Sequence, residues 1–359
     1  MAKITFQNLA HSYFKSEPAE NWALKPIDLV LESGRPYALV GPSGCGKTTI
    51  LNIISGIITP KQGKILFDND DVTNLPVKKR NVAQVFQFPT IYKSMNVFDN
   101  LAFPLICRNM EKNKIKERVG EIAEQIGISN KLNRSAFKLG ADEKQLVSLG
   151  RGLVRDDVTA LLMDEPLTVI DPQLKFELRK KIKQIVEGKN ITIIYVTHDQ
   201  YEAMTFADEL LVMSLGVLVQ RGTPEQLFEV PATKYVGNFI GSPAMNFLKV
   251  EADNGKARFG NLVFDTNEKV HNDLREELEI GIRPEYVKVA KSADANTISA
   301  TILERDNMGA YQVLNCKVDG GFIKMKVGMD EVSQGTSSIN LLFPKEKLHL
   351  YHKGELIAN

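Results

Sequence analysis

The chain has 359 residues, the length of about two ordinary domains. Its 45 basic and 44 acidic side chains give a formal net charge of +1, which excludes a protein that coats nucleic acid with a basic surface, so we expect no nucleic-acid partner. With 43% hydrophobic and 25% charged residues, the composition excludes a mainly disordered chain. No apolar run reaches the roughly 18 residues of a membrane-spanning helix, so we expect any membrane role to come through a partner protein.

The first 240 residues alternate short apolar runs with helical patterns, which is typical of an α/β domain. Continuous apolar runs predict strands buried on both faces of a parallel sheet, at residues 36–40, 160–163 and 191–196. A strand pair around a turn at Gly216 is predicted for residues 210–220. Polar residues directly follow the three parallel strands, which is where open α/β sheets place their chemistry.

Two helical regions are predicted within this domain. Residues 93–155 form a helical subdomain, and one helix in it has an apolar face at Ile115, Val119, Ile122 and Ile126. A second helix is predicted from Pro172 to Gly188, with Asp171 as its N-cap and the glycine as its stop.

The composition changes near residue 241, where Gly-Ser-Pro forms a predicted linker. Short alternating strands follow, as in Phe322–Val327, where apolar residues alternate with lysines. We therefore predict two domains, an α/β domain at residues 1–240 and a small β-barrel or sandwich at residues 241–359.

A glycine-rich loop follows the strand at residues 36–40 and matches the phosphate-binding pattern G-x-x-x-x-G-K-[ST]. Its residues are Gly41, Pro42, Ser43, Gly44, Cys45, Gly46, Lys47, Thr48 and Thr49. Glycines let successive backbone N–H groups surround phosphate oxygens at a helix N-terminus, whose dipole favours anions. We expect Lys47 to reach the β- and γ-phosphates and Thr48 to ligate Mg²⁺. A glycine-rich turn with a chance lysine is the alternative, and the strand before and helix after the loop argue against it.

Two adjacent carboxylates, Asp164 and Glu165, follow the strand at residues 160–163. An aspartate at a strand end can hold Mg²⁺, and the next carboxylate can orient or deprotonate an attacking water. Standing alone, the pair would be interpreted as solvated strand-end acids. The phosphate-binding loop upstream favours the catalytic interpretation.

The motif order GPSGCGKTT, VFQFPTIY, LLMDEPL, Asp171 and VTHD resembles that of the ATP-binding subunits of ABC transporters, over the first 240 residues. The resemblance implies a P-loop NTPase core of RecA-like type that binds ATP and Mg²⁺ and hydrolyses ATP. It implies that Glu165 is the catalytic carboxylate, that His198 contacts the γ-phosphate, and that Gln87 contacts Mg²⁺ and water.

The resemblance also implies nucleotide contacts outside the loop. Tyr13 is expected to stack on adenine, with Trp22 as the weaker candidate. The expected Mg²⁺ ligands are Thr48, Gln87 and Asp164, and Asp171 is expected near the nucleotide. His198 by itself would be interpreted as a structural histidine, and its place after a core strand favours the catalytic role.

One family motif departs from its pattern. The family's Leu-Ser-Gly-Gly-Gln signature binds the γ-phosphate held by the opposite subunit, and here the aligned residues are Leu139-Gly-Ala-Asp-Glu143. A carboxylate about 5 Å from that phosphate costs about 3 kcal/mol at an effective dielectric near 20. A lost hydrogen bond to a charged group adds roughly 1.5 to 3 kcal/mol. Asp142 is expected to cap the following helix, with Gln145 completing a capping box; alternatively, Lys144 neutralises the two acids.

The altered signature predicts an asymmetric dimer. Two composite sites form in this family, each from one subunit's phosphate loop and the other's signature. A homodimer would have two altered signatures, so we predict a heterodimer with a second ATPase subunit whose signature is intact, a second copy of this chain being the alternative. The next family motif also departs, since Thr168-Val-Ile-Asp171 stands where Ser-Asn-Leu-Asp is usual.

The region after residue 240 resembles the OB-like, TOBE-type regulatory domain of sugar and glycerol-3-phosphate importers, in GSPAMNF, GIRPEYVKV and LHLYHKGE. The resemblance implies a peripheral subunit at the cytoplasmic face of the membrane, bound to permease subunits and working indirectly with an extracytoplasmic solute-binding protein. Groove residues for the permease are expected at Phe88, Ile91, Tyr92 and Val97, with simple core packing as the alternative for this apolar cluster. Alternatives are an importer of iron, polyamine or phosphonate, an ATP-binding regulatory subunit without turnover, and a non-transport ABC ATPase.

Overall fold

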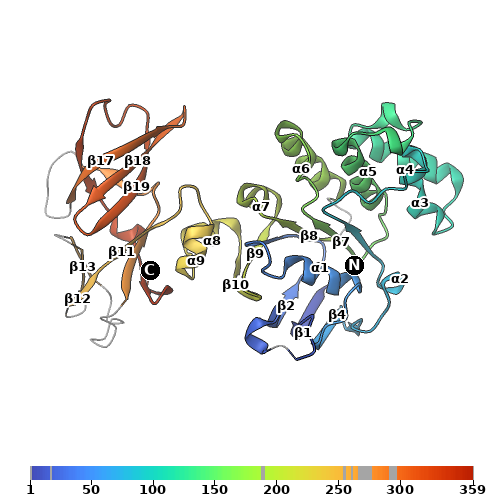
Figure 1. The fold of residues 1–359 in the computed structure, drawn as a ribbon, viewed down its shortest axis with the longest axis horizontal. Helices are drawn as coiled ribbons and strands as arrows, with labels where there is room; N and C mark the ends of the chain where they lie inside the picture. The colour runs from blue at the N-terminus through green and yellow to red at the C-terminus, as the bar shows by residue number, and fades with distance from the viewer. Residues whose placement is uncertain are drawn as a thin grey trace. The chain divides into compact units, whose positions relative to one another are not determined.

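The computed structural model describes residues 2–16, 18–186, 191–253, 256–259, 262–265, 277–290 and 297–358. The chain divides into two compact units, Met1–Pro224 and Glu225–Asn359, each with its own hydrophobic core (Figure 1). The composition change had predicted a boundary after residue 240. The helical residues between 225 and 240 belong to the second unit. Arg283 of that unit holds them by donating hydrogen bonds to the carbonyls of Phe228 and Gly237.

The central sheet of the first unit has the strand order β10-β9-β3-β8-β7-β6. All neighbours are parallel except β10 and β9, which form the predicted strand pair around Gly216. Every residue of β7 and β8 is buried, as the continuous apolar runs predicted. The bounds are β3 (Pro36–Val40), β6 (Val82–Val85), β7 (Ala160–Asp164), β8 (Thr192–Thr197), β9 (Glu209–Ser214) and β10 (Val217–Gly222).

A second sheet of the first unit is antiparallel and has the order β2-β1-β4-β5. Its strands are β1 (Ile4–His11), β2 (Leu24–Leu31), β4 (Gln62–Phe67) and β5 (Asp70–Asp71). The apolar side chains of this sheet and of the central sheet enclose helix α1 (Lys47–Ser55) in one core. The helix that follows the phosphate-binding loop is therefore fixed by packing on both sheets.

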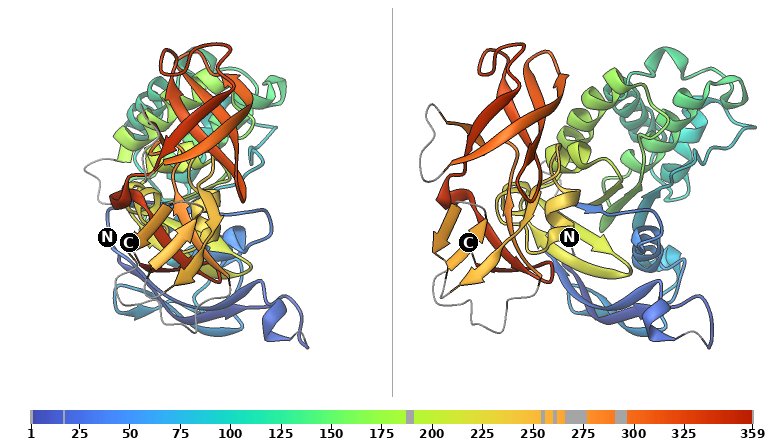
Figure 2. Two further views of the ribbon diagram at one scale, coloured as in Figure 1. Left: turned by 90° about the vertical axis from the view of Figure 1, so that its left-hand side faces the viewer. Right: turned by 60° about the vertical axis from the view of Figure 1, so that its left-hand side comes forward.

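The predicted helical subdomain consists of α3 (Val97–Ile106), α4 (Lys112–Gln125) and α5 (Ala141–Leu153), which contact one another. Both views of Figure 2 show this helical group on the opposite side of the first unit from the antiparallel sheet. The predicted apolar face of α4 is buried. The remaining helices of this unit are α2 (Val77–Arg80), α6 (Pro172–Val186) and α7 (Gln200–Phe206).

Helix α6 begins where the sequence predicted. The backbone N–H of Gln173 donates to Asp171 Oδ1 over 2.9 Å, and the Lys175 N–H donates to the Asp171 carbonyl over 2.9 Å. The Asp171 side chain thus satisfies one donor that the first turn of a helix leaves unpaired, and its carbonyl accepts the first backbone hydrogen bond of the helix. The predicted stop at Gly188 lies outside the described residues.

The second unit is rich in β-strands, as predicted. Its sheets have the orders β11-β15-β21-β22, β12-β13-β14 and β16-β20-β17-β18-β19. The alternation at Phe322–Val327 lies in β19, whose Ile323, Met325 and Val327 are buried. The elements are α8 (Pro224–Glu229), α9 (Lys234–Phe239), β11 (Asn246–Lys249), β12 (Glu251–Asp253), β13 (Lys256–Phe259), β14 (Leu262–Asp265), β15 (Leu278–Ile282), β16 (Lys288–Val289), β17 (Thr297–Asn307), β18 (Tyr311–Val318), β19 (Gly321–Gly328), β20 (Ser338–Leu342), β21 (His349–His352) and β22 (Glu355–Ala358).

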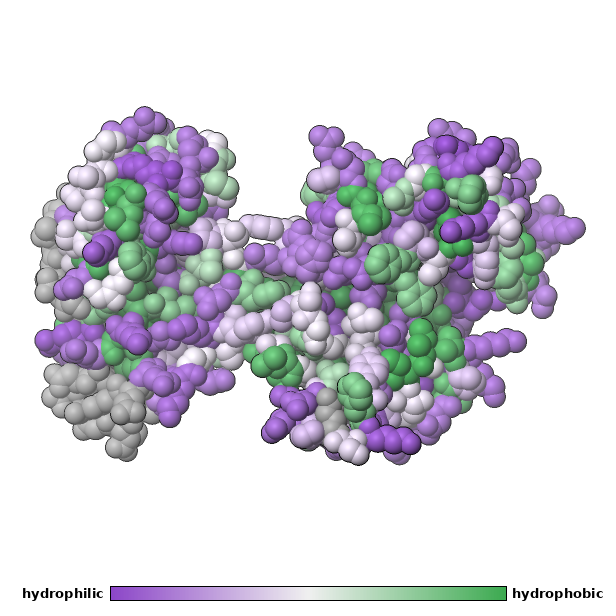
Figure 3. Space-filling model, viewed as in Figure 1, coloured by the Kyte–Doolittle hydropathy of each residue, from purple (hydrophilic) through white to green (hydrophobic). Residues whose placement is uncertain are grey.

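The surface is mainly polar on the face drawn in Figure 3. Hydrophilic residues cover most of the face drawn in Figure 3, and hydrophobic residues form separate patches between them. Across the described ranges, every helix is too short or too polar to span a bilayer.

Candidate active site

The candidate site lies at the carboxyl ends of three neighbouring strands. Val40 at the end of β3 pairs with Thr197 of β8, and Asp164 at the end of β7 pairs with Val196. The residues that follow these strands, the glycine-rich loop, Glu165 and His198, therefore meet at one edge of the sheet. They are far apart in sequence and adjacent only because the strands are parallel neighbours.

Two glycines of the phosphate-binding loop lie where a Cβ atom would clash with the backbone of another segment. Gly41 has φ +152°, and a Cβ atom on it would lie 2.3 Å from the carbonyl oxygen of Met213. Gly46 has φ +104°, and a Cβ atom there would lie 2.6 Å from the carbonyl oxygen of Ala23. Both positive φ values are strained for any residue with a side chain. The glycines therefore let the loop wrap closely and start α1 with its N–H groups directed into the loop.

Lys47 lies inside this loop. Its side chain is buried, and its ammonium group donates hydrogen bonds of 2.8 Å to the carbonyls of both Gly41 and Pro42. Both partners are neutral carbonyls, and neither cancels the charge of the ammonium group. The group therefore keeps its attraction for an anion. The loop thus combines a fixed positive charge with the N-terminus of α1.

A cavity of about 380 Å³ opens at the loop, a size typical of small-molecule sites. Most of the residues predicted to bind the nucleotide line this cavity. Ala23 also lines it and was not among the predicted residues. Its lining is Tyr13, Ala23, Ser43, Gly44, Gly46, Lys47, Thr48, Thr49, Gln87, Asp164 and Glu165. Gly41, Pro42 and Cys45 belong to the loop without lining the cavity, and Cys45 packs into the core.

Tyr13 is fixed beside the loop. Its hydroxyl lies 3.0 Å from Thr49 Oγ1, and its ring meets the His11 ring edge-on at 4.8 Å between centroids. The ring is nevertheless 58% exposed and so can be stacked upon. The alternative residue, Trp22, does not line the cavity, and Lys61 lies over its ring at 4.7 Å.

Asp164 is the buried carboxylate of the site. Burial raises its pKa above the usual range, while a hydrogen bond with Thr48 and the charge of Lys47 act in the opposite direction. A buried carboxylate beside a hydroxyl group is the hard oxygen ligand set that Mg²⁺ prefers. The residues present therefore fit the predicted metal.

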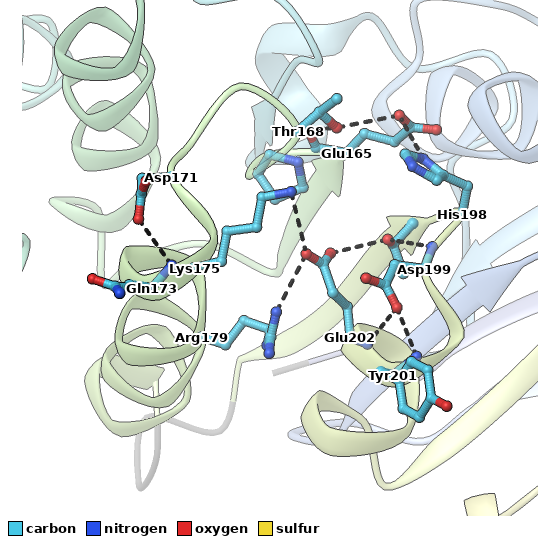
Figure 4. Close-up of polar contacts among 12 residues, drawn as sticks. Glu165, Thr168, Asp171, Gln173, Lys175, Arg179, His198, Asp199, Tyr201 and Glu202 are labelled. Carbon is cyan, nitrogen blue, oxygen red and sulfur yellow. Dashed lines mark hydrogen bonds and ion pairs between the residues drawn. The ribbon is translucent and has the colours of Figure 1, made fainter. Parts of the chain in front are cut away.

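Glu165 accepts three polar contacts on one oxygen. Its Oε2 lies 3.2 Å from His198 Nδ1 and 3.3 Å from Thr168 Oγ1 (Figure 4). The same oxygen lies 3.2 Å from Gln87 Nε2. Its backbone has φ +45°, a strained value of a kind that clusters at functional sites. Thr168 is a site residue that was not predicted, although its hydroxyl, retained where serine is usual in the family, was a usable signal.

The signature segment is capped differently from the prediction. Gly140 precedes α5, and its N–H donates to Glu143 Oε2 over 2.8 Å, so the carboxylate in the third helical position reaches back. The predicted cap by Asp142 is wrong, because Asp142 lies within the first turn and is exposed. Gln145 does not complete a capping box; it is buried and donates to the Pro166 carbonyl over 2.8 Å.

One acid of the signature segment, Glu143, is also neutralised differently from the prediction. Glu143 Oε1 lies 2.6 Å from Lys131 Nζ and 3.4 Å from Arg134 Nη1. The hydrogen bond from Lys131, followed by that from the Gly140 N–H, holds the pKa of Glu143 below its usual range. The proposed neutralisation by Lys144 is wrong, since the cations come from the segment before the helix.

The expected permease groove is only partly formed by exposed residues. Phe88 is 74% exposed and Tyr92 is 40% exposed, whereas Val97 is fully buried in the core. Val97 is therefore wrong as a groove residue. Tyr92 packs under Arg151, whose guanidinium carbon lies 4.6 Å from its ring centroid.

Comparisons with known proteins agree with this architecture. The family described as ABC transporter matches residues 24–168, the MalK OB fold domain matches residues 241–287, and the TOBE domain matches residues 280–350. These matches confirm the predicted fold class.

Two relatives span nearly the whole chain. The trehalose/maltose import ATP-binding protein MalK of Thermococcus litoralis is 35% identical over 350 residues, which covers 92% of this chain and 94% of that protein. The sn-glycerol-3-phosphate import ATP-binding protein UgpC of Vibrio vulnificus is 37% identical over 304 residues, with coverage of 84% and 80%. A solved dimeric structure of the ATP-binding cassette MJ0796, bound to ADP and Pi, is similar to this chain with a TM-score of 0.55 and 24% sequence identity. The match covers 61% of this chain and 98% of that chain, and it supports the fold alone.

Proposed function

This chain belongs to the ATP-binding proteins of ABC transporters, which hydrolyse ATP, and we propose that it energises the import of a carbohydrate or a glycerol-3-phosphate-like solute. The named relatives import trehalose/maltose and sn-glycerol-3-phosphate, which supports this solute class. Iron, polyamine or phosphonate import is the alternative. The chain would act at the cytoplasmic face of the membrane, bound to permease subunits and served indirectly by a solute-binding protein.

The site residues divide the chemistry among them. Tyr13 would stack on adenine, and Lys47 with the loop N–H groups would bind the phosphates. Thr48, Gln87 and Asp164 would hold Mg²⁺, which supplies charge neutralisation for the phosphates. The observation that carries the proposal is the position of Glu165 at the cavity, with Gln87 and His198 on its Oε2.

Glu165 would orient and deprotonate the attacking water. Its three contacts restrict the carboxylate to one position, which is what a general base requires of its neighbours. His198, with a side chain that is 61% exposed, is free on its other side to contact the γ-phosphate. Asp171, at the start of α6, would contribute to nucleotide binding.

We also propose that the chain pairs with a different ATPase subunit whose signature is intact. In this chain the N–H of Gly140, at the N-terminus of α5, is already bound to Glu143, so this donor is occupied by a side chain of its own helix. Lys131 and Arg134 offset part of the Glu143 charge, while Asp142 stays exposed on the first turn. A phosphate at this helix end would meet an occupied donor and a second carboxylate.

The experiment restores the signature in the purified chain. Gly140→Ser, Ala141→Gly, Asp142→Gly and Glu143→Gln together recreate Leu-Ser-Gly-Gly-Gln. We expect little ATP turnover by the original chain alone and a large gain in the restored variant. Adding Glu165→Gln to the restored variant should remove the gain. An original chain that turns over ATP alone as fast as the restored variant would show that two copies suffice and would end the heterodimer proposal.

A further inference from the structure

A buried carboxylate contacts the residue that precedes the predicted catalytic histidine. Glu202, on α7, is only 5% exposed. Its Oε2 accepts hydrogen bonds of 3.0 Å from the hydroxyls of both Tyr195 and Thr197. Its Oε1 lies 3.3 Å from Arg179 Nη1 and 3.9 Å from Lys175 Nζ, both on α6 (Figure 4). A buried carboxylate persists only when it is compensated in this way.

The contacts of Glu202 reach both neighbours of His198. Thr197 Oγ1, which donates to Glu202, also accepts a 3.0 Å hydrogen bond from the Asp199 backbone N–H. Asp199 Oδ1 in turn accepts from the N–H of Tyr201 at 2.8 Å and of Glu202 at 3.3 Å. The residues before and after His198 are therefore tied to one carboxylate through a short chain of hydrogen bonds.

His198 itself has little packing to hold it. Its side chain is 61% exposed, and its contact with Glu165 Oε2 is 3.2 Å long. The direction of its ring therefore depends on the backbone turn at Thr197–Asp199 more than on packing around the ring. Asp199 caps α7 at one end of that turn, and Glu202 connects Thr197 at its other end to α6.

We propose that Glu202 is a positioning residue for ATP hydrolysis. Its carboxylate fixes the backbone turn that carries His198, and so keeps the imidazole beside Glu165. The proposal rests on the proposed function, in which His198 and Glu165 act together. Arg179 and Lys175 compensate the Glu202 carboxylate and also connect it to α6, the helix that starts after Asp171.

The test measures steady-state ATP hydrolysis by the assembled transporter, with its permease and partner ATPase. Glu202→Gln should lower kcat about tenfold to hundredfold, because small misplacements of a catalytic group have effects of this size. The KM for ATP should change little, because Glu202 does not line the nucleotide cavity. Glu177→Gln, at an exposed position of α6, is the matched control and should keep the original kcat.

A double-variant cycle with His198→Ala separates positioning from general destabilisation. If Glu202 acts through His198, Glu202→Gln should lower kcat no further in the His198→Ala background. Equal reductions in both backgrounds, or no reduction in the original one, would overturn the inference. If His198→Ala alone leaves kcat unchanged, the proposed function of His198 is refuted, an outcome distinct from failure of the Glu202 inference alone.

A second pair of variants covers the case in which Glu202→Gln does not fold. Thr197→Val removes the bridging hydroxyl and keeps the β-branched shape, whereas Thr197→Ser keeps the hydroxyl. We expect the valine variant to lose kcat by about the same factor and the serine variant to retain it. Valine and serine variants with the same kcat would contradict the proposal.

Discussion

His198 Nδ1 lies 3.2 Å from Glu165 Oε2, although the two residues follow different strands of the central sheet. Gln87 and Thr168 contact the same oxygen. Glu165 is therefore held by residues from three separate parts of the chain, at the mouth of the phosphate-binding loop. This convergence gives the proposed general base a single position, and it makes the site sensitive to each of its neighbours.

Glu165→Gln should remove hydrolysis and keep nucleotide binding. The amide has the shape of the carboxylate and no basic oxygen, so we expect kcat to fall about a hundredfold or more, the usual contribution of a general base. ATP hydrolysis and the affinity for a fluorescent ATP analogue, measured on the assembled transporter, are the two readouts. Unchanged transport in this variant would instead favour an ATP-binding regulatory subunit.

Asp164→Asn should stabilise the protein and abolish its response to Mg²⁺. Because burial raises the pKa of Asp164, the ionised carboxylate costs the folded state free energy at pH values above that pKa. The cost disappears below the unfolded pKa of about 3.9, where both states are protonated. The variant should therefore have the higher melting temperature at pH 7, and a smaller advantage near pH 4.

The response to Mg²⁺ is measured by the same thermal denaturation. Mg²⁺ with ATP should raise the melting temperature of the original chain more than ATP alone does, and the variant should lose that difference. An asparagine variant that is less stable at pH 7 would show that the hydrogen bond with Thr48 outweighs burial.

Glu143→Ala should destabilise the first unit. The change removes the hydrogen bond from the Gly140 N–H and the contact with Lys131, and loss of a helix cap costs about 1 kcal/mol. Because the folded pKa of Glu143 is lowered, its stabilisation is present above the unfolded pKa of about 4.3 and is lost as the pH falls through the folded value. Chemical denaturation at pH 7 and at low pH measures both effects.

Asp142→Ala is the matched control for Glu143→Ala. It removes the same charge from the adjacent residue, which is exposed and does not form the cap. We expect a change in unfolding free energy of less than about 0.5 kcal/mol, as for surface substitutions in general. Equal losses in the two variants would contradict the assigned cap.

Arg283→Met should destabilise the second unit. Arg283 is 1% exposed and donates to the carbonyls of Phe228 and Gly237, each over 2.9 Å, and to that of Ile240. Methionine would remove the Arg283 donor from the carbonyls of Phe228 and Ile240, at about 1 to 3 kcal/mol each, whereas the Gly237 carbonyl would keep its 3.1 Å hydrogen bond from the Met245 N–H. Calorimetry should show a lower melting temperature for the second unit, while the exposed control Arg258→Met stays close to the original chain. A melting profile equal to that of the original chain would refute the prediction.

Much of the fold could be predicted because local patterns fix it. Continuous apolar runs identified β3, β7 and β8, a 3.6-residue period identified α4, and Asp171 identified the start of α6. The phosphate-binding loop was readable because Gly41 and Gly46 occupy backbone conformations that exclude other residues. The comparisons confirmed the family that these motifs had indicated.

The amino-acid sequence by itself therefore determined the element types, the loop and the identity of the carboxylates, since each depends on residues a few positions apart. Only the tertiary structure decided which partners those side chains acquire. It paired Glu143 with Lys131 rather than Lys144, buried Val97, and gathered Gln87, Thr168 and His198 on Glu165. The physical reason is that strand order and helix packing bring distant residues within 3 to 4 Å of one another, a separation at which hydrogen bonds and ion pairs form and which sequence spacing does not encode.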